Sequence, residues 1–414
     1  MKKIKKTKGF AACLTAVCLL CGCGDDASAG VSDEGPLWKM GMEDVLYGAG
    51  QGSTDADATG AGNGADYTGS GAESGTGSGE GFGETNEAAT ESQEKDNTVT
   101  ITISAAGDVT LGNHQNQEYA SSFRQTYDRE GDAYFLQNVK DIFAADDMTI
   151  VNFEGVLTFS DEKQEKDYNM KGDPDYINIL TEGCVEAVSF GNNHRLDYLT
   201  EGSSDTVAAF EEAKLTYAYD NITGIYEVKG IRIGIVSVNE VSQGAGVEKY
   251  LQEGIAQLKE EEGADLVIAC CHWGIERENY PEDYQKELGR KCIDWGADLV
   301  LGSHPHVLQG VDVYKDKFIV YSLANFCFGG NRNPADKDTM IFSQTFTFEE
   351  GVKQEDMEAR VIPCSVSSVK NRNDFCPTPL TGEEYTRVLQ RINEYSAPFG
   401  VAFDADGCYV EPNW

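Results

Sequence analysis

Basic residues are scarce in this chain. The 414 residues include 33 Lys and Arg against 70 Asp and Glu, which gives a formal net charge of -37. This excess of negative charge argues against nucleic-acid binding through phosphate contacts and against a polybasic membrane patch. An anionic substrate would have to be held by local cations or by a metal ion, against the overall field.

Paired cysteines of the zinc-binding kind are also missing. Of the 12 cysteines, four lie within the first 23 residues, and those that follow form no CxxC pair, so no thiolate zinc site is expected. Cys270 and Cys271 lie in an apolar run and are expected to be free buried thiols. A disulfide is considered only between Cys364 and either Cys376 or Cys408. No internal repeat is present, which disfavours a surface-adhesion module.

The first 23 residues have the pattern of a bacterial export signal. Five lysines between positions 2 and 8 precede a short apolar stretch from Phe10 to Leu20, which is too short for a spanning helix. The ending Leu20-Cys21-Gly22-Cys23 resembles a lipobox, which implies lipid attachment to Cys23 and cleavage before it. An ordinary secretory signal with incidental cysteines is the alternative. The lipobox predicts an extracytoplasmic protein anchored to the outer face of the bacterial cytoplasmic membrane.

The remainder divides into a tether and a folded domain. Residues 24–97 are rich in Gly, Ser, Thr, Ala, Asp and Glu and have almost no apolar pattern, so they are expected to be a disordered acidic tether. Residues 98–414 are expected to form one folded domain, and its first strand begins with the alternating β-branched run at 98–106.

Strands and helices are expected to alternate along this domain. Strands are expected at 98–106, 147–153, 187–190, 265–271, 298–302 and 317–323, helices at 135–145, 173–182, 200–214, 247–262, 281–295 and 382–395, a hairpin at 226–238, and antiparallel strands at 340–348 and 355–363. The alternation predicts βαβ units in a mostly parallel sheet, and the later paired strands predict a mixed or second sheet.

Polar side chains follow several of these strands. Because carboxyl ends of parallel strands form one crevice, they are expected to converge. The residues concerned are Asp108, Glu154, Asn193, His272, His304 and Asn325. The chain has only five histidines, and four of them lie in short clusters after apolar runs, at 191–194, 271–274 and 302–306. The fifth, His114, is expected to lie at the rim rather than to bind metal.

Carboxylates, an amide and imidazoles form a donor set that suits Mn, Fe, Zn or Mg. Two ions bridged by a carboxylate can activate water, and a neighbouring histidine can protonate a leaving group. Each motif alone also has an ordinary structural interpretation: Asn192 to His194 as a helix cap, His272 as a core residue packed on Trp273, and Glu276 as an exposed charge. Their joint placement at strand ends favours a site.

Six motifs resemble those of CapA-type proteins, and they occur in the order seen in that family. They are 106–109 (AGDV), 152–154 (NFE), 191–198 (GNNHRLDY), 272–276 (HWGIE), 302–307 (GSHPHV) and 321–326 (YSLANF). The resemblance spans about residues 101–328. It implies a role in synthesis or export of a poly-γ-glutamate capsule.

The CapA domain in turn resembles calcineurin-like metallophosphoesterases. This implies a four-layer α/β/β/α sandwich with mixed sheets and a site for two divalent metal ions. In this resemblance the metal ligands are Asp108, Glu154, Asn193, His272, His304 and His306, the catalytic residues are His194 and Asp197, and the substrate-binding residues are Asn152, Arg195, Glu276 and Asn325.

Three positions depart from the pattern of these families. Thr110 stands where the phosphoesterases have a histidine, Glu154 replaces the usual bridging Asp, and Ala324 stands where Gly is common. Two functions therefore remain open. One is a metal-dependent hydrolase or transferase that acts on a phosphoester or on an amide in a glutamate polymer or the cell wall. The other is a non-catalytic subunit that binds the anionic polymer beside membrane-embedded capsule synthase subunits.

Overall fold

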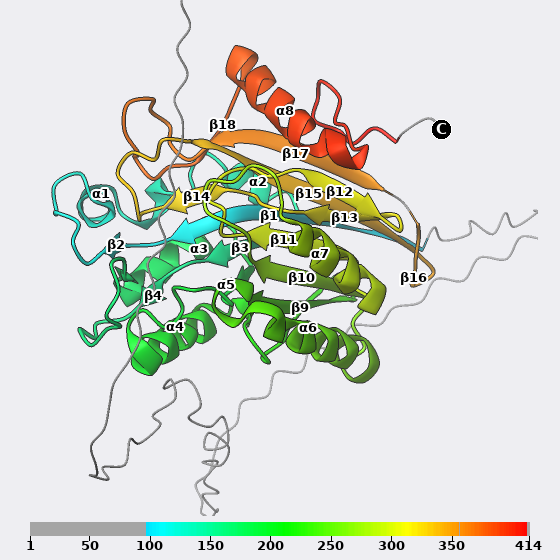
Figure 1. The fold of residues 1–414 in the computed structure, drawn as a ribbon, viewed down its shortest axis with the longest axis horizontal. Helices are drawn as coiled ribbons and strands as arrows, with labels where there is room; N and C mark the ends of the chain where they lie inside the picture. Colours follow the sequence, from blue (N-terminus) through cyan, green and yellow to red (C-terminus); the bar gives the residue numbers. More distant parts are fainter. Residues whose placement is uncertain (1–96, 356, 412–414) are drawn as a thin grey trace, which may run out of the picture. The chain divides into compact units, whose positions relative to one another are not determined.

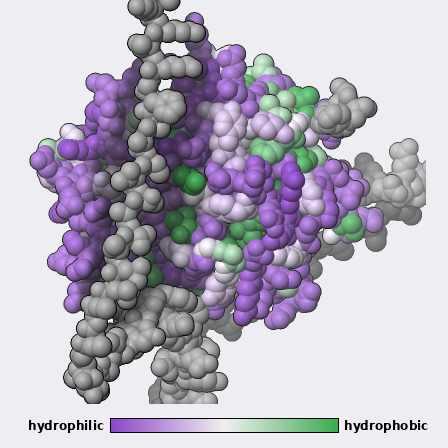
Figure 2. Space-filling model, in the orientation of Figure 1, coloured by the Kyte–Doolittle hydropathy of each residue, from purple (hydrophilic) through white to green (hydrophobic). Residues whose placement is uncertain are grey.

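The computed structural model describes residues 97–355 and 357–411. The predicted export signal, Cys23 and the acidic tether lie outside these residues. Within the described part, none of the helices combines the length and apolar character needed to cross a bilayer. The face drawn in Figure 2 is largely hydrophilic, with apolar side chains in small separate groups.

Two large sheets dominate the described part of the chain (Figure 1). The first contains β18 (Thr378–Pro379), β17 (Glu358–Ser365), β15 (Asp338–Glu349), β1 (Thr98–Thr110), β3 (Met148–Phe153), β6 (Ala187–Ser189) and β7 (Thr216–Ala218) in that order, with β14 (Asn325–Phe328) paired to β1 and β16 (Val352–Lys353) paired to β15. The second has the order β12 (Val311–Tyr314), β13 (Lys317–Val320), β11 (Leu299–Ser303), β10 (Leu266–His272), β9 (Ile231–Asn239) and β8 (Gly224–Val228). A small third sheet joins β2 (Asn113–His114), β5 (Met170–Gly172) and β4 (Val156–Leu157).

Both large sheets are mixed. β1, β3, β6 and β7 run parallel, whereas β15 pairs antiparallel with β1 and β17. In the second sheet β9, β10, β11 and β13 are parallel, and β8 and β12 are antiparallel at its edges. The parallel strands bring several carboxyl ends to one side of each sheet, as the alternation of elements predicted.

Alternation of side chains along the strands produces the layers. In β10, Leu266, Ile268 and Cys270 enter the core shared by the two sheets, while Val267 and Ala269 face the other way. The outer face of the second sheet packs on α6 (Val247–Ala256) and α7 (Asp283–Trp295). The outer face of the first sheet is covered by α1 (Phe123–Glu130), α2 (Lys140–Phe143), α3 (Asn178–Glu182) and α4 (Leu199–Ala213). The predicted α/β/β/α order is therefore confirmed.

Two helices lie outside this layering. α5 (Glu240–Gln243) directly follows β9, and α8 (Gly382–Ser396) packs against β17 and β12, at the edges of both sheets (Figure 1). Val388, Leu389 and Ile392 of α8 enter the core shared by the sheets. The C-terminal helix therefore closes one open edge of the sandwich.

Two predicted elements differ from the structure. The helix expected at 135–145 is reduced to α2, because Phe135 is held in the core by stacking on Phe123, with ring centroids 4.3 Å apart. The strand expected at 317–323 ends at Val320, and after Ala324 the chain enters the first sheet as β14. Asn325 therefore begins a strand instead of following one. The short strands β2, β4, β5, β7, β12 and β18 and the helix α1 were not predicted.

The cysteines of the described part are free, including the three considered for a disulfide. The pairing of Cys364 with Cys376 or Cys408 is therefore wrong. The Cys364 thiol donates instead to the carbonyl of Ile362, and the Cys376 thiol to that of Tyr134. The prediction of free buried thiols at Cys270 and Cys271 is confirmed, and burial raises the pKa of Cys270 to about 12.

A buried carboxylate ties the amino end of β11 to three lysines. Asp298 is only 2% exposed and pairs with Lys259 at 2.8 Å, Lys317 at 3.2 Å and Lys353 at 2.5 Å. Its Oδ2 also accepts from the backbone N–H of Val267. Burial alone would raise the pKa of Asp298, but the three ammonium groups outweigh it and lower the pKa to about 2.

Asp298 is expected to make the stability pH-dependent. Because its folded pKa is lowered, the stabilisation is complete above its unfolded pKa near 3.8 and is lost as the pH falls through about 2. Asp298→Asn should lower the free energy of unfolding by about 2 kcal/mol at pH 7, and the deficit should shrink between pH 4 and pH 2. Urea unfolding between pH 2 and pH 7 measures the loss of stability and its dependence on pH. The control Asp294→Asn removes an exposed pair with Lys315 and should leave the stability nearly unchanged across the same pH range. An Asp298→Asn deficit independent of pH would contradict the assignment.

Candidate metal centre

The predicted ligands come from both sheets. Asp108 lies near the end of β1, Glu154 directly follows β3, and Asn193 follows β6. His272 ends β10, and His304 directly follows β11. The parallel direction of β1, β3 and β6 on one side and of β10 and β11 on the other brings these side chains to one edge of the sandwich.

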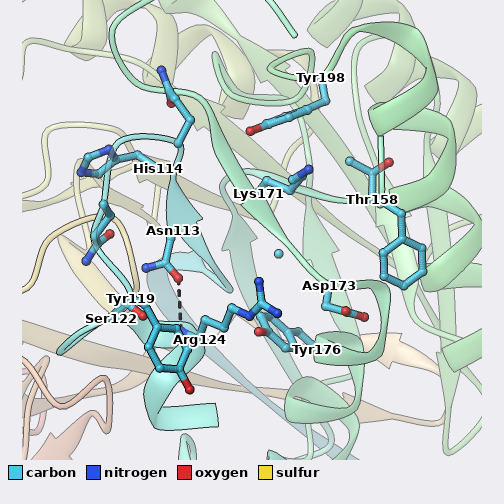
Figure 3. A pocket seen from close by; sticks show the side chains of 14 residues that line it. Asn113, His114, Tyr119, Ser122, Arg124, Thr158, Lys171, Asp173, Tyr176 and Tyr198 are labelled. Atoms are coloured by element: carbon cyan, nitrogen blue, oxygen red, sulfur yellow. Dashed lines mark hydrogen bonds between the residues drawn. The ribbon is translucent and has the colours of Figure 1, made fainter. Parts of the chain in front are cut away.

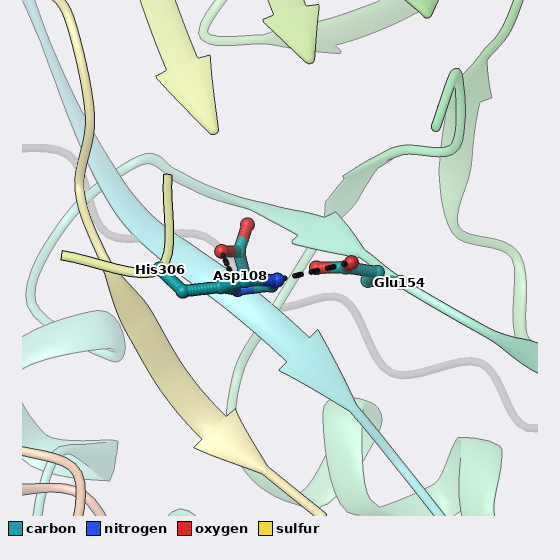
Figure 4. A group of neighbouring side chains, drawn as sticks. All are labelled: Asp108, Glu154 and His306. Atoms are coloured by element: carbon teal, nitrogen blue, oxygen red, sulfur yellow. Dashed lines mark hydrogen bonds and ion pairs between the residues drawn. The ribbon is translucent and has the colours of Figure 1, made fainter. Parts of the chain in front are cut away.

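Asp108, Glu154 and His306 form the most compact group (Figure 4). One donor atom from each lies within 4.8 Å of the donor atoms of the other two. His306 Nδ1 is 3.0 Å from Asp108 Oδ2, and its Nε2 is 3.7 Å from Glu154 Oε1. Both carboxylates are buried, whereas His306 is partly exposed, so one side of the group remains open.

The other predicted ligands, Asn193, His272 and His304, lie next to this group. Asn193 Oδ1 lies 2.9 Å from His272 Nε2, which is hydrogen-bonding distance. The ring centroids of His272 and His304 are 4.8 Å apart, and those of His304 and His306 are 5.7 Å apart. The structure thus brings all six predicted ligands into one continuous cluster.

Two buried donor atoms in this cluster lack protein partners. Among the described residues, Glu154 Oε2 and His304 Nδ1 have no hydrogen-bond partner. An unsatisfied buried polar atom costs about 1–3 kcal/mol, so its retention calls for an explanation such as a bound ion. The oxygen and nitrogen donor set suits a hard or borderline divalent metal. The residues present therefore fit metal binding.

The pKa shifts follow from burial and from the two carboxylates. Burial lowers the pKa of His304 to about 4 and holds that of His272 well below its ordinary value. Burial also raises the pKa of Glu154, to about 8. Burial opposes protonation of His306, but Glu154 and Asp108 outweigh it and raise its pKa to about 10. His272 and His304 are therefore neutral at pH 7, which is the form that binds metal.

His194 lies beside the cluster and is oriented by Asp197. His194 Nδ1 is 2.7 Å from Asp197 Oδ2, and its Nε2 is 3.6 Å from Glu154 Oε1. Lys166 forms an ion pair with Asp197 and donates to the carbonyl of Asn193. An imidazole with one nitrogen fixed by a carboxylate presents the other to the reacting groups, which is the arrangement of a general acid or base.

The four predicted substrate-binding residues have different surroundings. Asn152 donates to Asp108 Oδ1 at 2.8 Å, and Asn325 Oδ1 lies 3.0 Å from His306 Nδ1, so both hold ligands in place. Glu276 is exposed, and its charge acts on Glu154, His304 and His306. Arg195 instead pairs with Asp220 and lies over the Tyr219 ring, 4.7 Å from its centroid. These contacts bind Arg195 to the fold.

Two positions near the cluster were not predicted. Ser303 Oγ lies 3.0 Å from His272 Nδ1, and Lys166 holds Asp197 from a loop that carries no motif. Ser303 stands inside the 302–307 motif, so its proximity was available from the sequence, whereas nothing local marks Lys166. Thr110, on the same side of β1 as Asp108, has a buried hydroxyl without a partner among the described residues.

The backbone is strained where it carries these residues. His304, His306 and Ala324 have φ values of 96°, 57° and 66°, a region that non-glycine residues rarely adopt. A Cβ on Gly107 would lie 1.8 Å from the carbonyl oxygen of Ala324, which accepts from the N–H of Asp108. Gly107 therefore allows the chain crossing between the sheets to touch β1. Such strain is common at functional sites.

Ala324→Gly is expected to stabilise the protein, because glycine adopts a φ of 66° without the steric cost of a Cβ. The expected gain is about 1 kcal/mol in the free energy of unfolding, measured by urea denaturation. The matched control is Ala208→Gly on the exposed face of α4, which should lose about 1 kcal/mol. A lower free energy of unfolding in both variants would show that Ala324 is not strained.

Comparison with known proteins agrees with the motifs. Residues 102–330 match the model of the family described as bacterial capsule synthesis protein PGA_cap, which is more than half of the chain. The chain belongs to this family. The resemblance to CapA-type proteins is thereby confirmed.

Two curated relatives of this capsule family member are CapA proteins. The chain is 29% identical over 251 residues to the capsule biosynthesis protein CapA of Bacillus anthracis, covering 55% of this chain and 59% of the relative. It is 28% identical over 245 residues to the PGA biosynthesis protein CapA of Bacillus subtilis strain 168, covering 54% and 62%. The chain thus spans about three fifths of the length of these relatives.

A solved 5'-nucleotidase from Candida albicans SC5314 is similar at 13% identity and a TM-score of 0.36, over 73% of this chain and 59% of that chain. At this TM-score the fold assignment rests on the sheets and layers described above.

Proposed function

We propose that this capsule family member is a metal-dependent hydrolase or transferase that acts on γ-glutamyl amide bonds of the capsule polymer. The observation that carries the proposal is the position of His194. Its Nδ1 is fixed by Asp197, and its Nε2 faces Glu154 of the candidate metal centre. A centre with a poised acid or base beside it is suited to protonate a leaving amine.

In this proposal the ligands would form two groups, with Glu154 contributing to both. Asp108, Glu154 and His306 would hold one divalent ion, and Glu154, Asn193, His272 and His304 the other. Bound ions would supply Lewis-acid polarisation and a water of lowered pKa. Asn152 and Asn325 keep Asp108 and His306 in place, and Lys166 keeps Asp197 against His194.

Location and partners belong to the same proposal. Lipid attachment at Cys23 would anchor the domain to the outer face of the cytoplasmic membrane, and the tether of residues 24–97 would let it reach beyond the surface. There it would work beside membrane-embedded capsule synthase subunits on an anionic glutamate polymer. The support is the lipobox-like ending and the family to which the chain belongs.

One observation favours the second candidate, a non-catalytic polymer-binding subunit of a capsule synthase. Thr110 offers a hydroxyl where the phosphoesterases have an imidazole ligand, which leaves the Asp108 side of the centre with fewer donors. A weakened first metal position would bind carboxylates without completing hydrolysis.

Metal content and turnover of the full-length protein test the proposal together. Inductively coupled plasma mass spectrometry on dialysed protein should find bound divalent metal. The metal-loaded protein should cleave either a γ-glutamyl amide oligomer or a small phosphodiester, and only the first result supports action on the capsule polymer. Tight metal binding without turnover of either substrate would favour the non-catalytic subunit, and a well-folded protein that binds no metal would refute the enzyme.

A further inference from the structure

A cavity of about 460 Å³ lies beside the small third sheet (Figure 3). Its walls come from β2, the start of α1, β4–β5 and the residue that precedes α4. The volume is within the range of about 300–1,000 Å³ typical of ligand sites. None of the six predicted metal ligands lines it.

The charged lining of this cavity is unusual for a chain with a net charge of -37. Arg124 and Lys171 contribute two cations, and Asp173 contributes one carboxylate. Asp173 Oδ1 is already used as an acceptor for the backbone N–H of Asp175, 3.1 Å away. The lining therefore carries a net positive charge where the molecule as a whole repels anions.

Both cations are available to a ligand. In residues 97–355 and 357–411 no carboxylate lies within ion-pair distance of the Arg124 guanidinium, and only the backbone of Arg124 is hydrogen-bonded, to Asn113. Lys171 Nζ donates to the carbonyl of Ser160 at 2.6 Å and pairs with Asp161 at 3.0 Å, which leaves one of its three N–H groups for a ligand. The Asp161 side chain is fully exposed, so solvent and salt weaken that pair. In Figure 3 the ends of Arg124 and Lys171 reach toward the same space between Tyr176 and Tyr198.

The uncharged walls suit an amide-linked chain. Tyrosine rings from Tyr119, Tyr176 and Tyr198 supply flat surfaces with a polar end, and Asn113 supplies an amide Nδ2 that has no partner among the described residues. Lys171 Nζ lies 4.7 Å from the centroid of Tyr198, which fixes its direction. A ligand that alternates carboxylates with peptide-like amides would find both kinds of partner here.

The cavity adjoins the His194–Asp197 pair through the chain itself. Tyr198 lines the cavity, and the preceding residue Asp197 orients His194. Met170 donates its N–H to Asp197 and is followed directly by Lys171, which also lines the cavity. Two residues that line the cavity, Lys171 and Tyr198, are therefore direct chain neighbours of the residues that hold Asp197 and His194 in place.

From these observations we propose that this cavity is a subsite for an anionic polymer, in which Arg124 and Lys171 bind carboxylates of a γ-linked glutamyl chain next to the reacting bond. The subsite rests on the proposed function for the identity of the polymer. It adds two residues, Arg124 and Lys171, that no motif marked.

Binding of hexa-γ-glutamate to the full-length protein tests the subsite. Isothermal titration calorimetry should show that Arg124→Gln and Lys171→Gln each weaken binding by about tenfold, because each removes a charge-assisted contact. Binding by the native protein should also weaken as salt is raised. The matched control is Lys249→Gln, which removes an exposed lysine of α6 whose carboxylate partner is 3.9 Å away, and it should bind within twofold of the native protein.

The outcomes separate the subsite from the proposed function. Metal content should stay unchanged in the Arg124→Gln and Lys171→Gln variants, because neither residue touches the metal ligands. Native protein that fails to bind hexa-γ-glutamate, or variants that bind it as tightly as the native protein, would overturn the subsite. The proposed enzyme function would still be tested independently by metal binding and by turnover of the small phosphodiester by the native protein. The Arg124 side chain is exposed and makes no hydrogen bond or ion pair with the residues that the structure describes, so Arg124→Gln is expected to remain folded.

Discussion

His304→Ala is expected to remove most of the bound divalent metal from the purified protein. Loss of a residue that merely supports a ligand costs about 10–100-fold in metal affinity, so loss of the ligand itself should exceed about 100-fold. His304 is buried, and its pKa near 4 keeps it neutral at pH 7. Its Nδ1 lacks a partner among the described residues. Mass spectrometry of dialysed full-length protein measures the metal-to-protein ratio.

The matched control for this variant is His114→Ala. His114 lies on β2, packs edge-on against Tyr168 and lines the cavity instead of the metal cluster. Its removal should leave the metal ratio unchanged. Equal metal content in the native protein and in folded His304→Ala would show that His304 is not a ligand.

His194→Ala is expected to lower kcat by about 10²–10⁴-fold while the metal content stays near the native value. The candidate metal ligands, including Glu154, are unchanged in this variant. The imidazole that Asp197 orients for proton transfer is lost. Turnover of the γ-glutamyl oligomer and of a small phosphodiester, each at saturating substrate, measures the loss.

Asp197→Asn completes the test of His194. An amide in place of the carboxylate keeps the shape but removes the negative charge and one of the two acceptor oxygens that hold His194 Nδ1 and Lys166. The rate should fall toward that of His194→Ala, and the double variant should be scarcely slower than either single one, because the two residues act as a unit. Full activity in His194→Ala would exclude a proton-transfer role and leave the non-catalytic subunit as the better account.

Several features could be predicted from local sequence because local physics decides them. The period-two pattern of residues 98–106 specifies a strand that buries one face, and β1 contains it. The Lys229-Gly230 turn specifies the hairpin of β8 and β9, since both residues have positive φ. Four metal-site donors could also be predicted, because they are polar residues at or directly after the ends of predicted strands. They are Asp108, Glu154, His272 and His304.

Other features depended on contacts between distant segments. The shortening of α2 follows from Phe135 stacking on Phe123, and the early end of β13 follows from the chain crossing between sheets at Ala324. Arg195 lies in a family motif, yet its charge is used by Asp220. Such partners are set by the packing of whole elements and leave no periodic signal in the chain.

The sequence by itself determined the alternating strands and helices, the family, and five donors at strand ends (Asp108, Glu154, Asn193, His272 and His304), because strand direction and side-chain alternation follow from neighbouring residues. Only the tertiary structure decided that Lys166 holds Asp197, that Cys364, Cys376 and Cys408 stay free, and that Arg124 and Lys171 face one cavity. These arrangements depend on how two sheets and a small third one are stacked, and residues that meet in this way need share no spacing along the chain.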